Sequence, residues 1–136
     1  MLVKSWRKQD MRILLIVALT GLLLPGCGTT EQFPAIPADL DRSTVQTDTV
    51  VVTAKRYVFE PEEIKTKPGR LIVLKVTAAD GTHGFALPAF GIDERLEKGV
   101  TKLIEFYVPK PGKFDFKCSH FCGIGHFGMN GQVIAE

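Results

Sequence analysis

Lys113-Phe-Asp-Phe-Lys-Cys118 alternates polar and apolar residues and runs directly into the loop Ser119-His-Phe-Cys122-Gly-Ile-Gly-His126-Phe-Gly-Met129. Alternation with a period of two predicts a strand with one face in the core. Phe114, Phe116 and Cys118 share that face. We therefore expect the Cys118 thiol to lie partly sheltered where the strand ends, at the pole of the fold.

Other segments along the chain predict strands of the same kind, because they are short and rich in β-branched and aromatic residues. They are Thr49 to Phe59, Leu71 to Thr77, Val100 to Val108 and Gln132 to Ala135. Pro-Gly turns precede the second of these segments and follow the third, and no long helical pattern is present. The expected fold is all-β, an antiparallel sandwich or barrel forming a single domain over residues 47–136. Phe59, Phe106, Phe114 and Phe116 are its expected core aromatics.

The N-terminus has the pattern of a secretory signal. A basic stretch precedes the apolar run Ile13 to Leu24, which is too short to span a bilayer, since a spanning helix needs about 20 residues. Leu24-Pro25-Gly26-Cys27 follows and resembles a bacterial lipobox. We expect residues 1–26 to be a lipoprotein signal peptide, with Met1 or Met11 as the start. Cys27 would carry the lipid that anchors the chain to a membrane of the bacterial cell envelope, with the domain in the periplasm or outside the cell.

A plain signal peptide with an incidental cysteine is the alternative to lipidation. Residues 27–46 contain Pro34, Pro37 and several Ser and Thr but no apolar periodicity, which predicts a flexible tether between the anchor and the domain.

The charge distribution argues against nucleic acid as a partner. The chain has 17 basic and 15 acidic residues. Four of the basic residues and one of the acidic residues lie before Cys27, so the rest of the chain has 13 basic and 14 acidic residues and a net charge of −1. No basic stripe is left in that part. Hydrophobic residues make up 45% of the chain and charged residues 24%, which is typical of a packed domain.

The residues that could bind a metal gather in two places. His83 stands in one, and Cys118, Cys122, His126 and Met129 recur at intervals of four, four and three in the other. Thiols, imidazoles and a thioether form a soft ligand set that suits copper in its lower oxidation state. Three glycines in the loop let the backbone curl so that the side chains converge.

Cys-Ser-x-x-Cys-Gly-x-x-His-x-x-Met closely resembles the binuclear copper-A loop of cytochrome c oxidase subunit II and, less closely, that of nitrous-oxide reductase. The segment His83 to Ile92 looks like the part of the oxidase subunit that carries its first histidine ligand. The resemblance extends from about Tyr57 to Glu136. It implies a cupredoxin-like Greek-key β-sandwich.

The resemblance also implies the roles of the ligands. Cys118 and Cys122 would be bridging thiolates between two copper ions, and His83 and His126 would each bind one of the ions. Weak ligands would be Met129 and, for the other ion, the backbone carbonyl of His120. The sequence differs from the oxidase pattern in having histidine at position 120, where many oxidases have a glutamate that serves a magnesium site, and in having its only tryptophan, Trp6, in the signal.

Such a centre passes single electrons in a respiratory chain. Apolar neighbours would keep water off the metals and offer a small docking patch: Phe85, Leu87, Phe90, Ile124 and Phe127. The expected partners are cytochrome c or another small redox protein as donor, and an oxidase core subunit if the chain is the electron-input part of a complex. No acid–base pair or open substrate site is visible, so the sequence predicts no enzyme acting alone.

Other interpretations remain open from the residues. Cys118 and Cys122 could form a disulfide outside the cytoplasm. The same cysteines with His83 and His126 could hold zinc, or one cysteine with both histidines could form a mononuclear blue-copper site. A different functional class is copper handling, as a chaperone, store or sensor.

Overall fold

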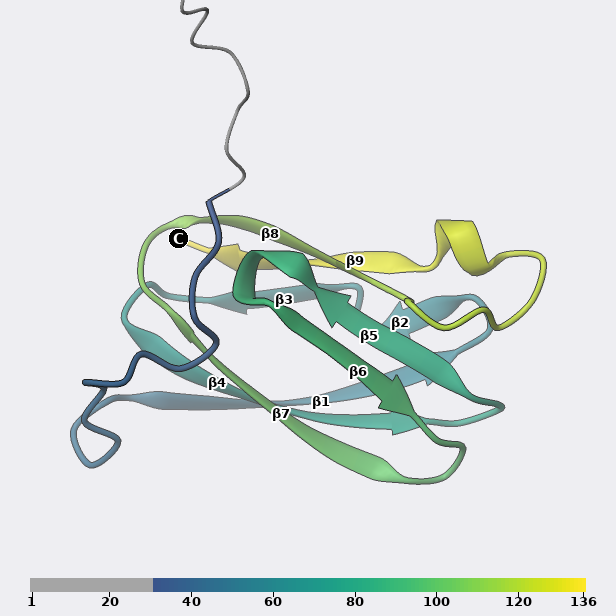
Figure 1. Cartoon of the computed structure of the whole chain (residues 1–136), viewed down its shortest axis with the longest axis horizontal. Coiled ribbons are helices and arrows are strands. Elements are labelled where there is room, and N and C mark those ends of the chain that lie inside the picture. The colour runs from purple at the N-terminus through teal and green to yellow at the C-terminus, as the bar shows by residue number, and fades with distance from the viewer. Residues whose placement is uncertain (1–30) are drawn as a thin grey trace, which may run out of the picture.

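The computed structural model describes residues 31–136, so the predicted signal peptide and Cys27 lie outside the described part. These residues form two β-sheets packed face to face (Figure 1). The first sheet has the strand order β2-β1-β4-β7 and the second β3-β9-β8-β5-β6. The strands are β1 (Thr47–Lys55), β2 (Val58–Glu60), β3 (Glu63–Thr66), β4 (Arg70–Ala78), β5 (His83–Leu87), β6 (Ile92–Leu96), β7 (Thr101–Val108), β8 (Gly112–Lys117) and β9 (Asn130–Ala135). The expected all-β sandwich is thus confirmed.

The pairing of the strands is mixed rather than purely antiparallel. β1 runs parallel to β4, and β3 runs parallel to β9, while the other pairs within the sheets are antiparallel. The chain passes between the sheets several times, so some strands that pair, such as β3 with β9 and β4 with β7, are not consecutive in sequence. The expectation of a purely antiparallel sandwich is therefore wrong in these two pairs.

The predicted strand over Thr49 to Phe59 is interrupted. It turns back at Arg56 and Tyr57, and β1 and β2 pair as a short antiparallel hairpin in which Thr53 lies opposite Glu60. β5 and β6 were not expected from the sequence, because their residues show no clean alternation. All five residues of β5 are buried.

The core between the sheets is aromatic. Phe59, Phe106 and Phe116 are fully buried and Phe114 is 8% exposed, as the alternation predicts. Phe59 packs edge-on against Phe116 with ring centroids 5.3 Å apart, and Phe85 stacks on Phe116 at 5.1 Å. Interlocked rings of this kind leave little freedom for repacking, so the strands that carry the metal-binding residues stand on a rigid base.

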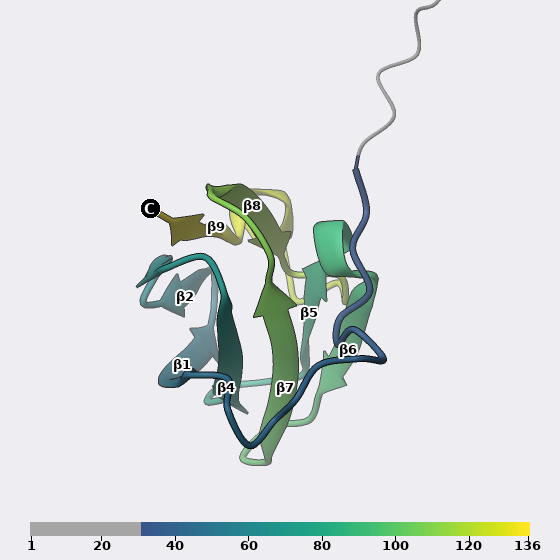
Figure 2. The same ribbon diagram turned by 90° about the vertical axis from the view of Figure 1, so that its left-hand side faces the viewer.

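Part of the expected tether over 27–46 is folded onto the domain. The Phe33 ring packs against Phe90 with centroids 5.7 Å apart, and the Tyr107 N–H donates to the carbonyl of Ala35 at 2.7 Å. This segment, residues 33–46, covers the free edge of β7, at the right of Figure 2. Covering an edge strand shields its unpaired backbone groups. The expectation of flexibility is therefore wrong from Phe33 onward. Within residues 31–136, no helix is long and apolar enough to cross a membrane.

Candidate metal centre

The loop between β8 and β9, which carries most of the predicted ligands, lies at one pole of the sandwich, at the right-hand end in Figure 1. His83 is the first residue of β5 and is fully buried. Cys118 directly follows β8, and Met129 directly precedes β9. The Cys118 N–H donates to the Met129 carbonyl at 2.9 Å and thereby closes the base of the loop. The loop is thus held at both ends by paired strands.

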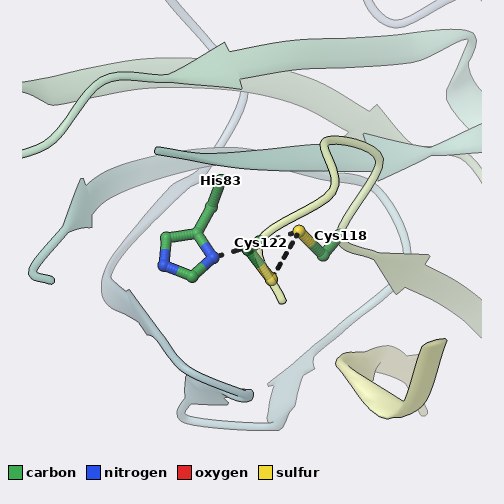
Figure 3. A group of neighbouring side chains, drawn as sticks. All are labelled: His83, Cys118 and Cys122. Atoms are coloured by element: carbon green, nitrogen blue, oxygen red, sulfur yellow. Dashed lines mark hydrogen bonds between the residues drawn. The ribbon is translucent and has the colours of Figure 1, made fainter. Parts of the chain in front are cut away.

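The two thiols lie close together and are both buried. Their Sγ atoms are 3.8 Å apart, and Cys118 and Cys122 are 4% and 8% exposed. Neither cysteine is in a disulfide. Figure 3 shows both side chains and the His83 ring pointing toward one another. Of the described side chains, His83, Cys118 and Cys122 form a group whose ligand atoms all lie within 4.8 Å of one another.

Each sulfur has its own imidazole. His83 Nδ1 lies 4.0 Å from Cys118 Sγ, and His126 Nδ1 lies 3.8 Å from Cys122 Sγ. His126 opens the short 3-10 helix η3 (His126–Gly128). The two histidines come from different elements, β5 and the loop, and each lies next to a different sulfur.

Two weaker donors complete the set. Met129 is buried, and its Sδ lies 3.8 Å from Cys122 Sγ. The carbonyl oxygen of His120 lies 3.1 Å from Cys118 Sγ. The structure therefore brings together all six donors that the sequence analysis named. The His120 imidazole is not among them, because it faces the guanidinium of Arg95 at 3.3 Å on the outer side of the loop.

These separations suit a bound metal. Two sulfurs that share a metal at about 2.3 Å each can be at most about 4.6 Å apart, and a sulfur and a nitrogen at about 2.3 and about 2.0 Å can be at most about 4.3 Å apart. The observed 3.8 Å between sulfurs and the 4.0 and 3.8 Å between sulfur and nitrogen fall inside these limits. The chemistry of the donors, two thiols with two imidazoles and a thioether, fits copper.

Hydrogen bonds fix the orientation of the ligands. His83 Nε2 lies 2.8 Å from a carboxylate oxygen of Asp80, so we place the ring proton on Nε2 and the free lone pair on Nδ1, which faces Cys118. This bond, followed by the N–H of Arg56, holds the pKa of Asp80 below its usual range. The Gly84 N–H points at Cys118 Sγ from 3.4 Å. Asp80 was not predicted as a partner from the sequence, although an acid three residues before a predicted ligand histidine is a signal for one.

Burial affects the acidity of the second thiol. The pKa of Cys122 is raised to about 11, first by burial and then by its contact with Cys118. Without a metal, the site therefore keeps Cys122 as a neutral thiol at ordinary pH. A metal ion must displace this proton, so metal uptake is coupled to proton release.

The expected docking patch is only partly at the surface. Phe85, Leu87 and Phe90 are 0%, 0% and 1% exposed, because they point into the core between the sheets, so their prediction as docking residues is wrong. Ile124 and Phe127 are 96% and 89% exposed.

Phe121, which the sequence analysis did not name, also lies at the surface and is 66% exposed. Its ring lies 5.6 Å from the ring of His126, and that of Phe127 lies 5.2 Å from it. We call Phe121, Ile124 and Phe127 the apolar rim. Two of its rings, those of Phe121 and Phe127, flank the partly exposed His126, a predicted ligand.

Known proteins resemble this chain in sequence and in fold. A family model described as a cupredoxin-like domain matches residues 26–135. A cytochrome c oxidase subunit 2 of Thermus thermophilus is 30% identical over 103 residues, covering 73% of this chain and 76% of that protein. The nitrous-oxide reductase of Cupriavidus necator is 34% identical over 92 residues, which cover 65% of this chain but only 14% of the reductase.

The fold comparison agrees. The crystal structure of the periplasmic domain of subunit II of cytochrome oxidase of Bradyrhizobium japonicum matches with a TM-score of 0.60 and 25% identity, covering 65% of this chain and 83% of that chain. The chain therefore belongs to the cupredoxin-like family, and within that family it is homologous to cytochrome c oxidase subunit II and to nitrous-oxide reductase.

Proposed function

We propose that this protein is an electron-transfer protein with a binuclear copper-A centre, and that it passes single electrons in a respiratory chain. One observation carries the proposal: two buried sulfurs 3.8 Å apart, each with an imidazole nitrogen within 4.0 Å. A mononuclear blue-copper site needs only one of these thiols and leaves Cys122 without a role. A tetrahedral zinc set leaves Met129 without one.

Cys118 and Cys122 would bridge the two ions, His83 and His126 would bind one each, and Met129 and the His120 carbonyl would be weak ligands. A bound copper pair would supply a one-electron couple shared between both ions. The residues of the chain hold the donors in place, since Cys118 and Met129 lie beside paired strands and His83 begins one. They also exclude water from the sulfurs, because the aromatic core lies beneath them.

The apolar rim is the expected docking site for an electron donor such as cytochrome c or another small redox protein. Weak electron-transfer encounters use small interfaces, and three large exposed apolar side chains on the loop that carries His126 offer such an area. An oxidase core subunit is a further expected partner, because relatives of this chain are oxidase subunits.

The expected anchor at Cys27 would keep the domain near its membrane. Only six positions separate Cys27 from Phe33, which is packed on the domain. An extended chain of that length reaches about 20 Å at most. If lipidation holds, labelling of the full chain with palmitate will mark the wild type and not Cys27→Ala. An unlabelled wild type would overturn the lipid anchor.

Copper analysis of the purified full chain tests the centre itself. After loading under reducing conditions and removal of excess metal, we expect two copper ions per wild-type chain. Cys122→Ser removes one of the bridging sulfurs and should lower this number. One ion per wild-type chain would contradict the proposal, and copper that is lost readily to a weak chelator would favour copper handling instead.

A further inference from the structure

The turn between β1 and β2 lies against the metal loop, although it is distant from that loop in sequence. Arg56 of this turn donates through its side-chain Nε to the carbonyl of Cys122 at 3.1 Å, across 66 positions of the chain. Arg56 is in no salt bridge among the described residues. The guanidinium therefore binds the backbone of the loop at the position of a proposed bridging thiol.

The same residue reaches the other half of the site through its backbone. The Arg56 N–H donates to Oδ2 of Asp80 at 2.8 Å, and Oδ1 of Asp80 lies 2.8 Å from Nε2 of His83. One residue thus links the histidine on β5 with the cysteine loop between β8 and β9. A substitution of the Arg56 side chain would break the first link and leave the second, which uses the main chain.

Tyr57 covers the loop next to this link. A Cβ at Gly123 would lie 2.5 Å from the Tyr57 hydroxyl oxygen, and a Cβ at Gly125 would lie 2.4 Å from the Tyr57 ring. The loop backbone therefore lies directly against the ring, at a distance that only glycine permits. Gly123 also has φ +133°, which other residues rarely adopt. Tyr57 is 39% exposed and lies between the loop and solvent rather than in the core.

We propose that Arg56 and Tyr57 are positioning residues of the metal centre, which brace the loop in its ligand-binding conformation. The inference rests on the proposed metal site. The loop from Cys118 to Met129 loses conformational entropy when its donors are ordered. Contacts that order it before the metal arrives make binding tighter and the ligand geometry more uniform.

The variant Arg56→Ala tests this in the full chain. Loss of a hydrogen-bonded partner beyond the ligands typically lowers metal affinity about 10-fold to 100-fold. We expect copper transfer to a competing chelator to become at least about tenfold faster. In the copper-free chain, amide hydrogen exchange from Cys122 to His126 should also accelerate. Tyr57→Ala should produce both effects.

Lys55→Ala is the matched control. Lys55 neighbours Arg56, carries the same charge and forms an exposed ion pair with Glu60. The variant should leave copper transfer and loop exchange as in the wild type. If Arg56→Ala and Tyr57→Ala behave like Lys55→Ala in both measurements, the bracing role is wrong.

The exchange measurement separates this inference from the proposed function. It uses the copper-free chain, so it reports on the brace whatever number of ions the site takes up. Two ions per wild-type chain with unchanged loop exchange in both variants would contradict the brace alone. One ion with accelerated exchange would contradict the binuclear centre alone.

Discussion

Large apolar side chains occur both in the core beneath the metal site, here called the aromatic base, and at the surface in the apolar rim. In the base, Phe59, Phe85 and Phe116 are fully buried. In the rim, Phe121, Ile124 and Phe127 are 66%, 96% and 89% exposed. The base supports the sulfurs rigidly. The rim side chains are not buried within the domain, so packing inside the domain does not explain why they are apolar. Exposed apolar groups beside His126, a proposed ligand, support the proposed contact with a redox partner.

The largest expected effect is loss of the proposed copper pair when one of the two bridging thiols is removed. Cys118→Ser should abolish binding of the copper pair, because a serine hydroxyl is a poor soft ligand and a bridging position is lost. Metal analysis and the visible absorption of thiolate-bound copper measure this. Ser119→Ala is the matched control: it removes only the exposed hydrogen bond to Asp93, and copper binding should persist. Retention of two ions in Cys118→Ser would contradict the bridging role.

Truncation in the base should cost far more stability than truncation in the rim. Phe116→Ala leaves a cavity in a packed core, and we expect a loss of about 3 to 5 kcal/mol in the free energy of unfolding. Phe127→Ala should change it by less than about 0.5 kcal/mol, since the ring is exposed. Denaturant unfolding of the copper-free chain compares the two. Equal losses would show that the rim is part of the core in solution.

Truncation in the rim should instead slow electron exchange with a partner. For Phe127→Ala, we expect the second-order rate with a soluble cytochrome c to fall about tenfold, a change of about 1.4 kcal/mol. Stopped-flow measurement with the copper-loaded chain gives this rate. Val51→Ala is the control, because Val51 is 65% exposed on β1 and lies outside the metal loop. A rate unchanged in Phe127→Ala would place the docking surface elsewhere.

The Cys122 thiol should make the folding stability of the copper-free chain fall at alkaline pH. The pKa of Cys122 is raised in the folded state, to about 11, so folding favours the neutral thiol. The corresponding stability is fully present below the pKa of the unfolded chain and is lost as the pH rises toward 11. Unfolding at a series of pH values measures the loss, which Cys122→Ser should reduce. A wild type whose stability stays constant over this alkaline range would contradict the raised pKa.

The sequence predicted the parts of the molecule that follow local periodicity or a compact motif. Phe114, Phe116 and Cys118 alternate along β8 and into the residue that follows it, so their common burial could be deduced. The ligands from Cys118 to Met129 stand within one loop, so their convergence could also be expected. In both cases the information lies in neighbouring residues.

Features that depend on distant segments were missed. The sequence does not show that Phe85 and Leu87 are buried, because all of β5 is buried and Phe85 packs against Phe59 and Phe116, which are distant in sequence. Phe33 stands in a segment rich in proline and threonine, and only the fold shows that its ring has a place beside Phe90. Arg56 lies 66 positions from the carbonyl that it contacts. No local pattern encodes such contacts.

Electron paramagnetic resonance of the copper-loaded full chain, poised with one unpaired electron per site, distinguishes an electron shared by two copper ions from one held by a single ion. We propose that one electron is shared by two equivalent copper ions held by the sulfurs of Cys118 and Cys122. We expect hyperfine splitting from two equivalent copper nuclei. A spectrum with splitting from a single nucleus would contradict it.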